Sequence, residues 1–189
     1  MLNRRIGRLD MEKKLNFLYS SVHGAYWVYY GVISSFSSVF LLARGFSNSQ
    51  IGIIIALANI LAVIIQPYLA DYVDRSRRTA IFSVMASMCI ALVLFTNIIL
   101  VAKNHGVLGV FYVAAFMLQS VMQPFCNGLN RVLEDGGNKI YFGFCRSIGS
   151  LVYSIVVVAL GYMVDSYTVD IIPKAGILTT LVLLIVVWF

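Results

Sequence analysis

The run of residues 79–102, TAIFSVMASMCIALVLFTNIILVA, decides the fold class. It carries no charged side chain, and its length is that of a helix crossing the roughly 30 Å hydrocarbon core of a bilayer, which takes about 20 residues. A continuous apolar run predicts a helix, because a strand of a membrane barrel alternates polar and apolar residues over about ten positions. We therefore expect this segment to be a transmembrane helix.

Five further apolar segments accompany this run. The six predicted membrane helices lie at about 15–43, 50–73, 79–102, 107–133, 140–164 and 171–189. Only 12% of the residues are charged, about half the share found in soluble domains. The composition thus predicts an all-α polytopic membrane protein with residues 1–14 as an amino-terminal segment and 15–189 as a six-helix bundle. The sixth helix is still apolar at Phe189, so we expect it to be incomplete and the sequence to be a fragment of a twelve-helix chain.

Lysines and arginines are distributed unevenly between the two predicted ends of the bundle. One end has those of the amino-terminal segment and of the two stretches 75–78 and 131–146, while the other end has only Arg44, Lys103 and Lys174. Because positively charged loops stay in the cytoplasm, this distribution predicts a cytoplasmic amino terminus in the plasma membrane. Topology and anionic headgroups account for the net charge of +6, so no nucleic-acid partner is predicted.

The sequence does not support enzyme chemistry or a metal site. Cys89, Cys126 and Cys145 lie within apolar segments, without a CxxC pair or a histidine at ligand spacing. His23 lies deep within a predicted helix, and no buried carboxylate accompanies it to form a catalytic pair. We therefore predict no enzyme activity, no metal and no cofactor.

Polar residues recur at helical spacing in the fourth segment. The stripe consists of Gln119, Gln123, Asn127, Asn130 and Glu134. Their intervals of four, four, three and four place them on one helix face, where unsatisfied polar groups in hydrocarbon would be costly. Any one amide could serve as an interhelical hydrogen bond worth about 0.6–2 kcal/mol. For the stripe as a whole, we favour a lining of a polar cavity.

A second stripe follows the first segment. It consists of Tyr19, His23, Trp27, Tyr30, Ser34 and Ser37. Aromatic rings with polar edges suit a sugar or nucleoside, because they offer a face for stacking and a group for orientation. The alternative is an aromatic belt at the membrane interface, which would account for Tyr19 more easily than for mid-helix residues.

Arg146 opens a long apolar run in the fifth segment, and Tyr153 lies two helical turns further on the same face. An arginine within a membrane needs a partner or water. Three interpretations remain open: a side chain reaching headgroups, a substrate contact, or a pairing with the fourth helix.

Residues 66–78, QPYLADYVDRSRR, resemble the loop signature of the major facilitator superfamily, G-x-x-x-D-[RK]-x-G-x-[RK]-[RK]. The matching positions are Ala70 at the first glycine, Asp74 at the acidic position, Arg75 after it, and Arg77 and Arg78 at the basic end. The resemblance implies a gating loop whose charges change partner between conformations. The alternative is a loop that only enforces topology.

Residues 141–150, YFGFCRSIGS, are similar to the F-G-x-x-R-x-x-G-S opening of the fifth helix in the lactose-permease-like group of oligosaccharide and nucleoside proton symporters. The similarity implies that Arg146 contacts the substrate and that Tyr153 takes the place of a stacking tryptophan. Asn130 stands where the galactoside permeases have a glutamate, which argues against galactosides. The family's fold has two six-helix halves around a site at the membrane midplane.

These resemblances imply a secondary active transporter of a small polar solute, coupled to protons and working by alternating access. The expected substrate-binding residues are Arg146, Tyr153, Asn130, Asn127, Gln123, His23, Trp27 and Tyr30. The expected partners are the solute, protons, the lipid bilayer, and either a missing carboxy-terminal half or a second copy of the chain. The alternatives are a ligand-binding or sensing membrane protein and a half-size transporter acting as a dimer.

Overall fold

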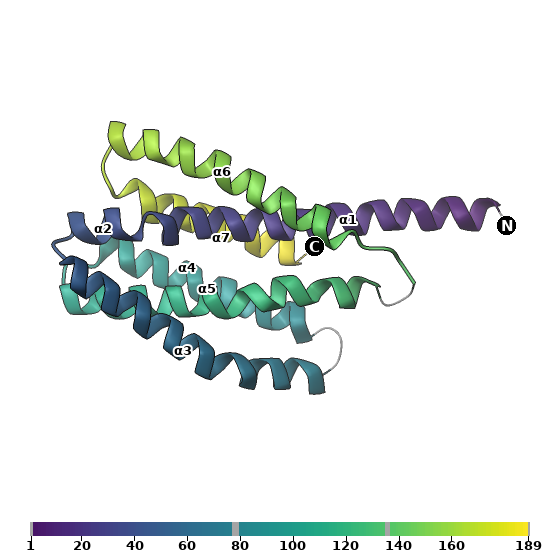
Figure 1. The fold of residues 1–189 in the computed structure, drawn as a ribbon, viewed down its shortest axis with the longest axis horizontal. Helices are drawn as coiled ribbons and strands as arrows, with labels where there is room; N and C mark the ends of the chain where they lie inside the picture. The colour runs from purple at the N-terminus through teal and green to yellow at the C-terminus, as the bar shows by residue number, and fades with distance from the viewer. Residues whose placement is uncertain (1, 77–79, 135–136, 189) are drawn as a thin grey trace.

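The computed structural model describes residues 2–76, 80–134 and 137–188, and these residues form helices joined by short turns, with no strand among them. The elements are α1 (Leu2–Tyr30), η1 (Gly31–Ser35), α2 (Ser37–Ala43), α3 (Asn48–Arg75), α4 (Ala80–Val101), α5 (His105–Glu134), α6 (Phe142–Ser166) and α7 (Ile171–Trp188) (Figure 1). Because α1, η1 and α2 follow one another as a single span, six segments are long and apolar enough to cross a membrane. The predicted all-α fold with six spans is confirmed.

The helix of the first span extends beyond the predicted apolar segment. That segment begins near residue 15, and α1 begins at Leu2 and includes the basic segment. Leu, Glu, Lys and Arg are all good helix formers, and no proline interrupts them, so the helix continues out of the apolar region.

The first span also contains one turn of π-helix, η1, between α1 and α2. Such turns are rare and occur often at functional sites. Gly31 begins this turn, and a Cβ atom there would lie 3.1 Å from both Tyr153 and Val157 of α6. The Tyr112 hydroxyl donates a hydrogen bond of 2.9 Å to the carbonyl of Ile33 within the turn. Neighbouring helices therefore hold this irregular turn in place.

The helices pack as a bundle with α1 near its centre. α1 contacts α5, α6 and α7, while α4 packs between α5 and α7. Figure 1 shows α6 along one edge of the bundle and α3 along the opposite edge, where α3 packs on α5. The beginning of α1 and the ends of α3 and α5 point toward the same end of the molecule (Figure 1).

At the other end, Arg44 joins three turns. Its Nη2 atom lies 2.6 Å from Asp170 Oδ1, and its carbonyl lies 2.6 Å from Nε2 of His105. Gly45 follows with a φ of 87°, and a Cβ atom there would lie 3.3 Å from the His105 ring. The capping box of Ser47 and Gln50 then starts α3. These contacts tie the α2–α3, α4–α5 and α6–α7 turns together.

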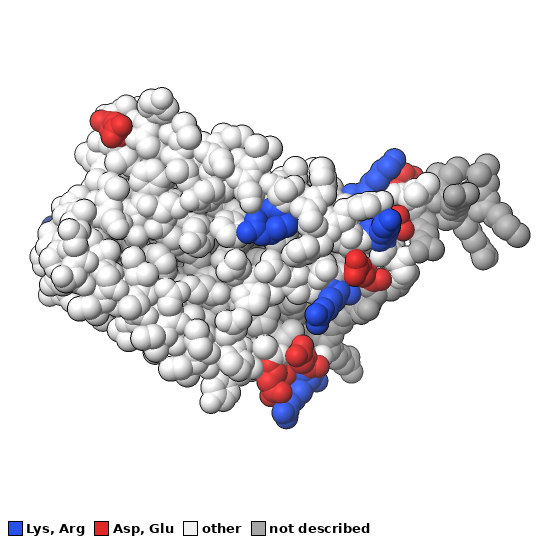
Figure 2. Space-filling model, in the orientation of Figure 1, with Lys and Arg blue, Asp and Glu red and all other residues white. Residues whose placement is uncertain are grey.

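The outer surface along the bundle is apolar. Large side chains such as Val63 on α3, Leu151 and Tyr162 on α6, and Leu178 on α7 are all more than half exposed. Figure 2 shows a face that is largely white, with most of its charged side chains toward the end where α1 begins. A surface of this kind fits the hydrocarbon of a bilayer.

Candidate solute-binding site

Arg146 on α6 lies against Trp27 on α1. Its guanidinium carbon is 4.0 Å from the centre of the indole ring, and its Nη1 donates a hydrogen bond of 2.9 Å to Ser150 Oγ. Tryptophan is the best aromatic partner for a cation. No carboxylate among the described residues forms an ion pair with Arg146. Most of its five N–H donors are thus free of protein partners within the described part of the chain.

Gly149 allows this contact between α1 and α6. A Cβ atom at Gly149 would lie 2.7 Å from Cδ1 of Trp27 and 3.1 Å from the carbonyl oxygen of His23. The two helices are therefore so close that even a methyl group at this position would require Trp27 to shift. The glycine of the F-G-x-x-R-x-x-G-S pattern thus has a local physical reason, which is the packing of the tryptophan under Arg146.

The rings of Trp27, Tyr30 and Tyr153 form an aromatic cluster. The ring centres of Trp27 and Tyr30 are 5.0 Å apart, and the ring of Tyr153 lies 6.2 Å from each of them. The Tyr153 hydroxyl forms a hydrogen bond of 3.0 Å with Ser35 in η1. The structure thus brings together Arg146, Trp27, Tyr30 and Tyr153, all four of which the sequence analysis predicts as substrate-binding residues.

A cavity of about 430 Å³ adjoins this aromatic cluster. It is lined by Tyr26, Tyr30, Ser34, Ser35, Ile55, Asn59, Phe116, Ser120, Gln123 and Tyr153. Its volume lies within the range of about 300–1,000 Å³ that is usual for small-ligand pockets. Hydroxyl and amide groups alternate with aromatic and aliphatic surface, so the cavity can hold a polar solute that also has apolar faces.

Sequence analysis missed part of the lining. Asn59 and Ser120 form a hydrogen bond of 3.3 Å between α3 and α5, and Ser35 lines the wall contributed by η1. Asn59 is an isolated amide within a long apolar helix, and this is a signal that could have identified it. Ser35 becomes part of the site through the π-helical turn, which no simple spacing rule predicts.

The polar stripe of α5 divides between two roles. Gln119 is buried and joins α5 to the first span, because its Oε1 accepts a hydrogen bond of 2.8 Å from Ser34 Oγ. Gln123 lines the cavity. Asn127 and Asn130 lie one and two turns further along and do not line it, and Glu134 is exposed at the helix end.

His23 and Tyr19 belong to the core and not to the cavity wall. Both are fully buried, with ring centres 4.7 Å apart, and neither nitrogen of His23 has a hydrogen-bond partner among the described residues. The Tyr19 hydroxyl donates to the carbonyl of Asn127 at 3.1 Å. The burial of Tyr19 is at odds with an interfacial aromatic belt, since a belt residue would lie against lipid headgroups.

The MFS_1 like family matches the chain over residues 19–189. The chain belongs to this family. The matched region contains α2 to α7, η1 and the part of α1 from residue 19 onward, and hence every residue of the cavity. No curated protein and no solved structure matches the sequence. Family membership makes this a transporter-type, multi-pass membrane protein of the major facilitator kind, and such a protein is not an enzyme in the usual sense.

The loop expected to gate this MFS_1-like protein is described only in part. Arg77 and Arg78 lie outside the described residues. Arg75 pairs with Asp71 at 2.7 Å, one helical turn away, and not with Asp74. Asp74 lines a separate cavity of about 230 Å³, between α3, α4 and α5, together with Arg131. The ends of α3 and α5 thus place one acidic and one basic side chain at the same small cavity.

Proposed function

We propose that this MFS_1-like protein is a secondary active transporter of a small polar solute, and that the solute binds at Arg146 and the adjoining aromatic cavity. The observation that carries the proposal is the guanidinium of Arg146, held 4.0 Å from the Trp27 ring without an ion-pair partner among the described residues. An arginine in a membrane span is a functional-site hypothesis by default, because its charge is costly there.

The chemistry of the cavity supports a sugar, an oligosaccharide or a nucleoside as the solute. Tyr30, Tyr153 and Phe116 offer aromatic faces for stacking, while Asn59, Gln123 and the serines offer hydrogen-bond donors and acceptors. The free N–H groups of Arg146 suit a hydroxyl, carbonyl or other oxygen-rich acceptor. Asn127, Asn130 and His23 remain proposed contributors that would have to reach the solute in another conformation.

Alternating access is the mechanism that we propose for this site. The solute would bind between this six-helix half and a second one, supplied by a continuation of the chain or by a second copy, and the halves would rock about it. Proton coupling is part of the proposal because residues 141–150 resemble a helix opening found in proton symporters. The excess of lysine and arginine near the beginning of α1 supports a plasma-membrane orientation with this end in the cytoplasm.

Trp27 provides a direct test, since the chain has two tryptophans and the other, Trp188, is 78% exposed on α7. In a Trp188→Phe variant, all indole fluorescence comes from the ring beneath Arg146. Sugars and nucleosides would be titrated against this variant, and uptake into proteoliposomes would be measured with and without an imposed pH gradient. A saturable fluorescence change, together with gradient-driven uptake of the same solute, is the expected result.

Arg146→Lys and Arg131→Lys form a matched pair for this test. Lysine keeps the charge but not the planar fork of donors, so Arg146→Lys should weaken binding at least tenfold. Arg131 is exposed at the end of α5, and its replacement should leave binding within about twofold of the parent. Equal binding by Arg146→Lys and the parent would remove Arg146 from the site, and no saturable response to any solute would refute the proposed substrate class.

A further inference from the structure

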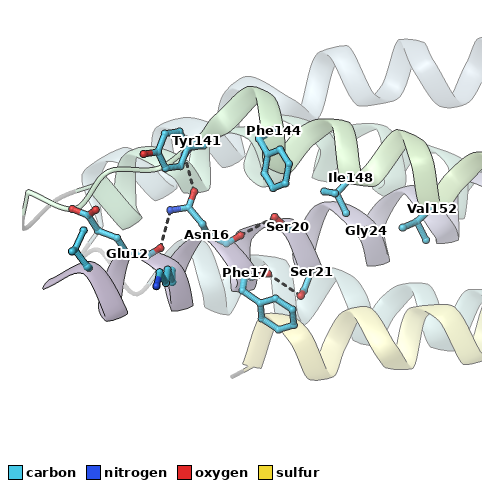
Figure 3. A pocket seen from close by; sticks show the side chains of 12 residues that line it. Glu12, Asn16, Phe17, Ser20, Ser21, Gly24, Tyr141, Phe144, Ile148 and Val152 are labelled. Carbon is cyan, nitrogen blue, oxygen red and sulfur yellow. Dashed lines mark hydrogen bonds between the residues drawn. The ribbon is translucent and has the colours of Figure 1, made fainter. Parts of the chain in front are cut away.

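A groove of about 720 Å³ lies between α1 and α6, near the end where α1 begins (Figure 3). Phe144, Ile148 and Val152 succeed one another at four-residue intervals along its α6 wall. Arg146 is two residues after Phe144, and at 3.6 residues per turn its side chain points about 200° away around the helix. The groove is therefore on the opposite side of α6 from the solute site.

Small residues of α1 hollow out the floor of the groove. Ser20, Ser21 and Gly24 line it, and a Cβ atom at Gly24 would have no neighbour within 4 Å. Both serine hydroxyls donate to carbonyls of their own helix, at 2.8 Å to Asn16 and 2.9 Å to Phe17. The floor of the groove is therefore deep, and both of its serine hydroxyls are already hydrogen-bonded. An apolar ligand could cover this floor without leaving a hydroxyl group unpaired.

The groove is the right length for one hydrocarbon chain. From Phe144 to Val152 the α6 wall rises about 12 Å at 1.5 Å per residue, and one leaflet of hydrocarbon is about 15 Å deep. Phe17 and Phe144 form aromatic rims and are 77% and 65% exposed. An acyl chain lying in the groove would cover apolar surface along most of a leaflet.

The mouth of the groove carries more positive than negative charge. Lys13 and Glu12 line it, and the ammonium of Lys139 lies 5.1 Å from the ring centre of Tyr141, another lining residue. Asn16 fixes this region by donating to the Lys139 carbonyl at 2.8 Å and accepting from the Tyr141 amide at 2.7 Å. Two lysines against one glutamate favour an anionic headgroup over a zwitterionic one.

We propose that this groove is a binding site for an anionic phospholipid from the leaflet at the amino-terminal end. One acyl chain lies on Ser20, Ser21 and Gly24 against the α6 wall, and the phosphate lies at Lys13 and Lys139. The inference rests on the membrane-spanning fold and does not require that the protein transports a solute.

The test is native mass spectrometry of the purified protein titrated with phosphatidylglycerol or phosphatidylcholine in detergent. We expect the first phosphatidylglycerol to bind at least fivefold more tightly than the first phosphatidylcholine. Lys13→Gln and Lys139→Gln should each reduce this preference about fivefold, the equivalent of about 1 kcal/mol per basic residue. Lys174→Gln is the matched control at the opposite end of the molecule and should leave the preference unchanged.

Gly24→Leu tests the groove itself, since the added side chain would occupy the space of the acyl chain. It should weaken binding of the first lipid at least fivefold, whereas Gly52→Leu, on an exposed and equally open face of α3, should not. Ser21→Leu offers a second way of filling the groove if Gly24→Leu does not fold. Equal affinity for the two lipids, or wild-type lipid binding in the filled-groove variants, would overturn the proposal in favour of non-specific annular lipid.

Discussion

Replacing Gly149 by alanine tests how closely α1 and α6 approach beneath Arg146. The added Cβ atom would lie 2.7 Å from Trp27 Cδ1 and 3.1 Å from the His23 carbonyl oxygen, and the second atom belongs to a backbone that cannot turn away. Overpacking of this kind costs about 1–3 kcal/mol. Since Trp27 must shift, we also expect the contact between its ring and Arg146 to be lost, together with solute affinity.

Gly143→Ala is the matched control, six residues earlier in the same helix, where a Cβ atom would meet nothing within 4 Å. Gly149→Ala gains the interior helix propensity of alanine over glycine, about 1 kcal/mol, and Gly143→Ala, in the first turn of α6, gains at most this amount. Gly149→Ala should therefore be less stable than Gly143→Ala by the overpacking cost of about 1–3 kcal/mol, less the difference between the two gains. Unfolding in mixed micelles by titration with a denaturing detergent, followed by circular dichroism, measures the difference.

The same two variants should also differ in solute binding. In the Trp188→Phe background, Gly149→Ala should shift the emission of Trp27 and weaken its response to solute, while Gly143→Ala should resemble the parent. If both variants were equally stable and bound solute equally well, the two helices would not be in the close contact described, and the reasoning about the site would fail.

Three further substitutions probe other contacts. Ser34→Ala should lower the free energy of unfolding by about 0.6–2 kcal/mol in the same assay, because Gln119 loses its hydrogen bond from Ser34. Stability equal to wild type would show that Gln119 finds another partner. Asp170→Asn should cost only about 0.2–1 kcal/mol, since the ion pair is partly exposed, and the loss should shrink in high salt if it is electrostatic. Tyr112→Phe removes the hydrogen bond to the Ile33 carbonyl in η1 and should lower the free energy of unfolding by about 1–3 kcal/mol. An unchanged free energy of unfolding would mean that the π-helical turn does not depend on that hydroxyl.

Sequence reasoning named candidate site residues, and the structure gives these residues different surroundings. Arg146 stood out in the sequence because a charge within a membrane span is costly, and the structure places it against Trp27. Gln119 and Gln123 looked equivalent at helical spacing, yet one is buried against Ser34 and the other lines the cavity. Spacing places residues on one face of a helix, but it does not say which neighbour covers each part of that face.

The sequence by itself determined the number and approximate limits of the membrane spans, because hydrophobic length is a property of each segment alone. Its motifs also indicated the family to which the chain belongs. Only the tertiary structure decided that His23 is enclosed in the core, that Asn59 and Ser120 meet across the cavity, and that small residues of α1 leave a groove beside α6. These features depend on the rotation and close approach of helices distant in the chain, which side-chain packing sets and which no local pattern encodes.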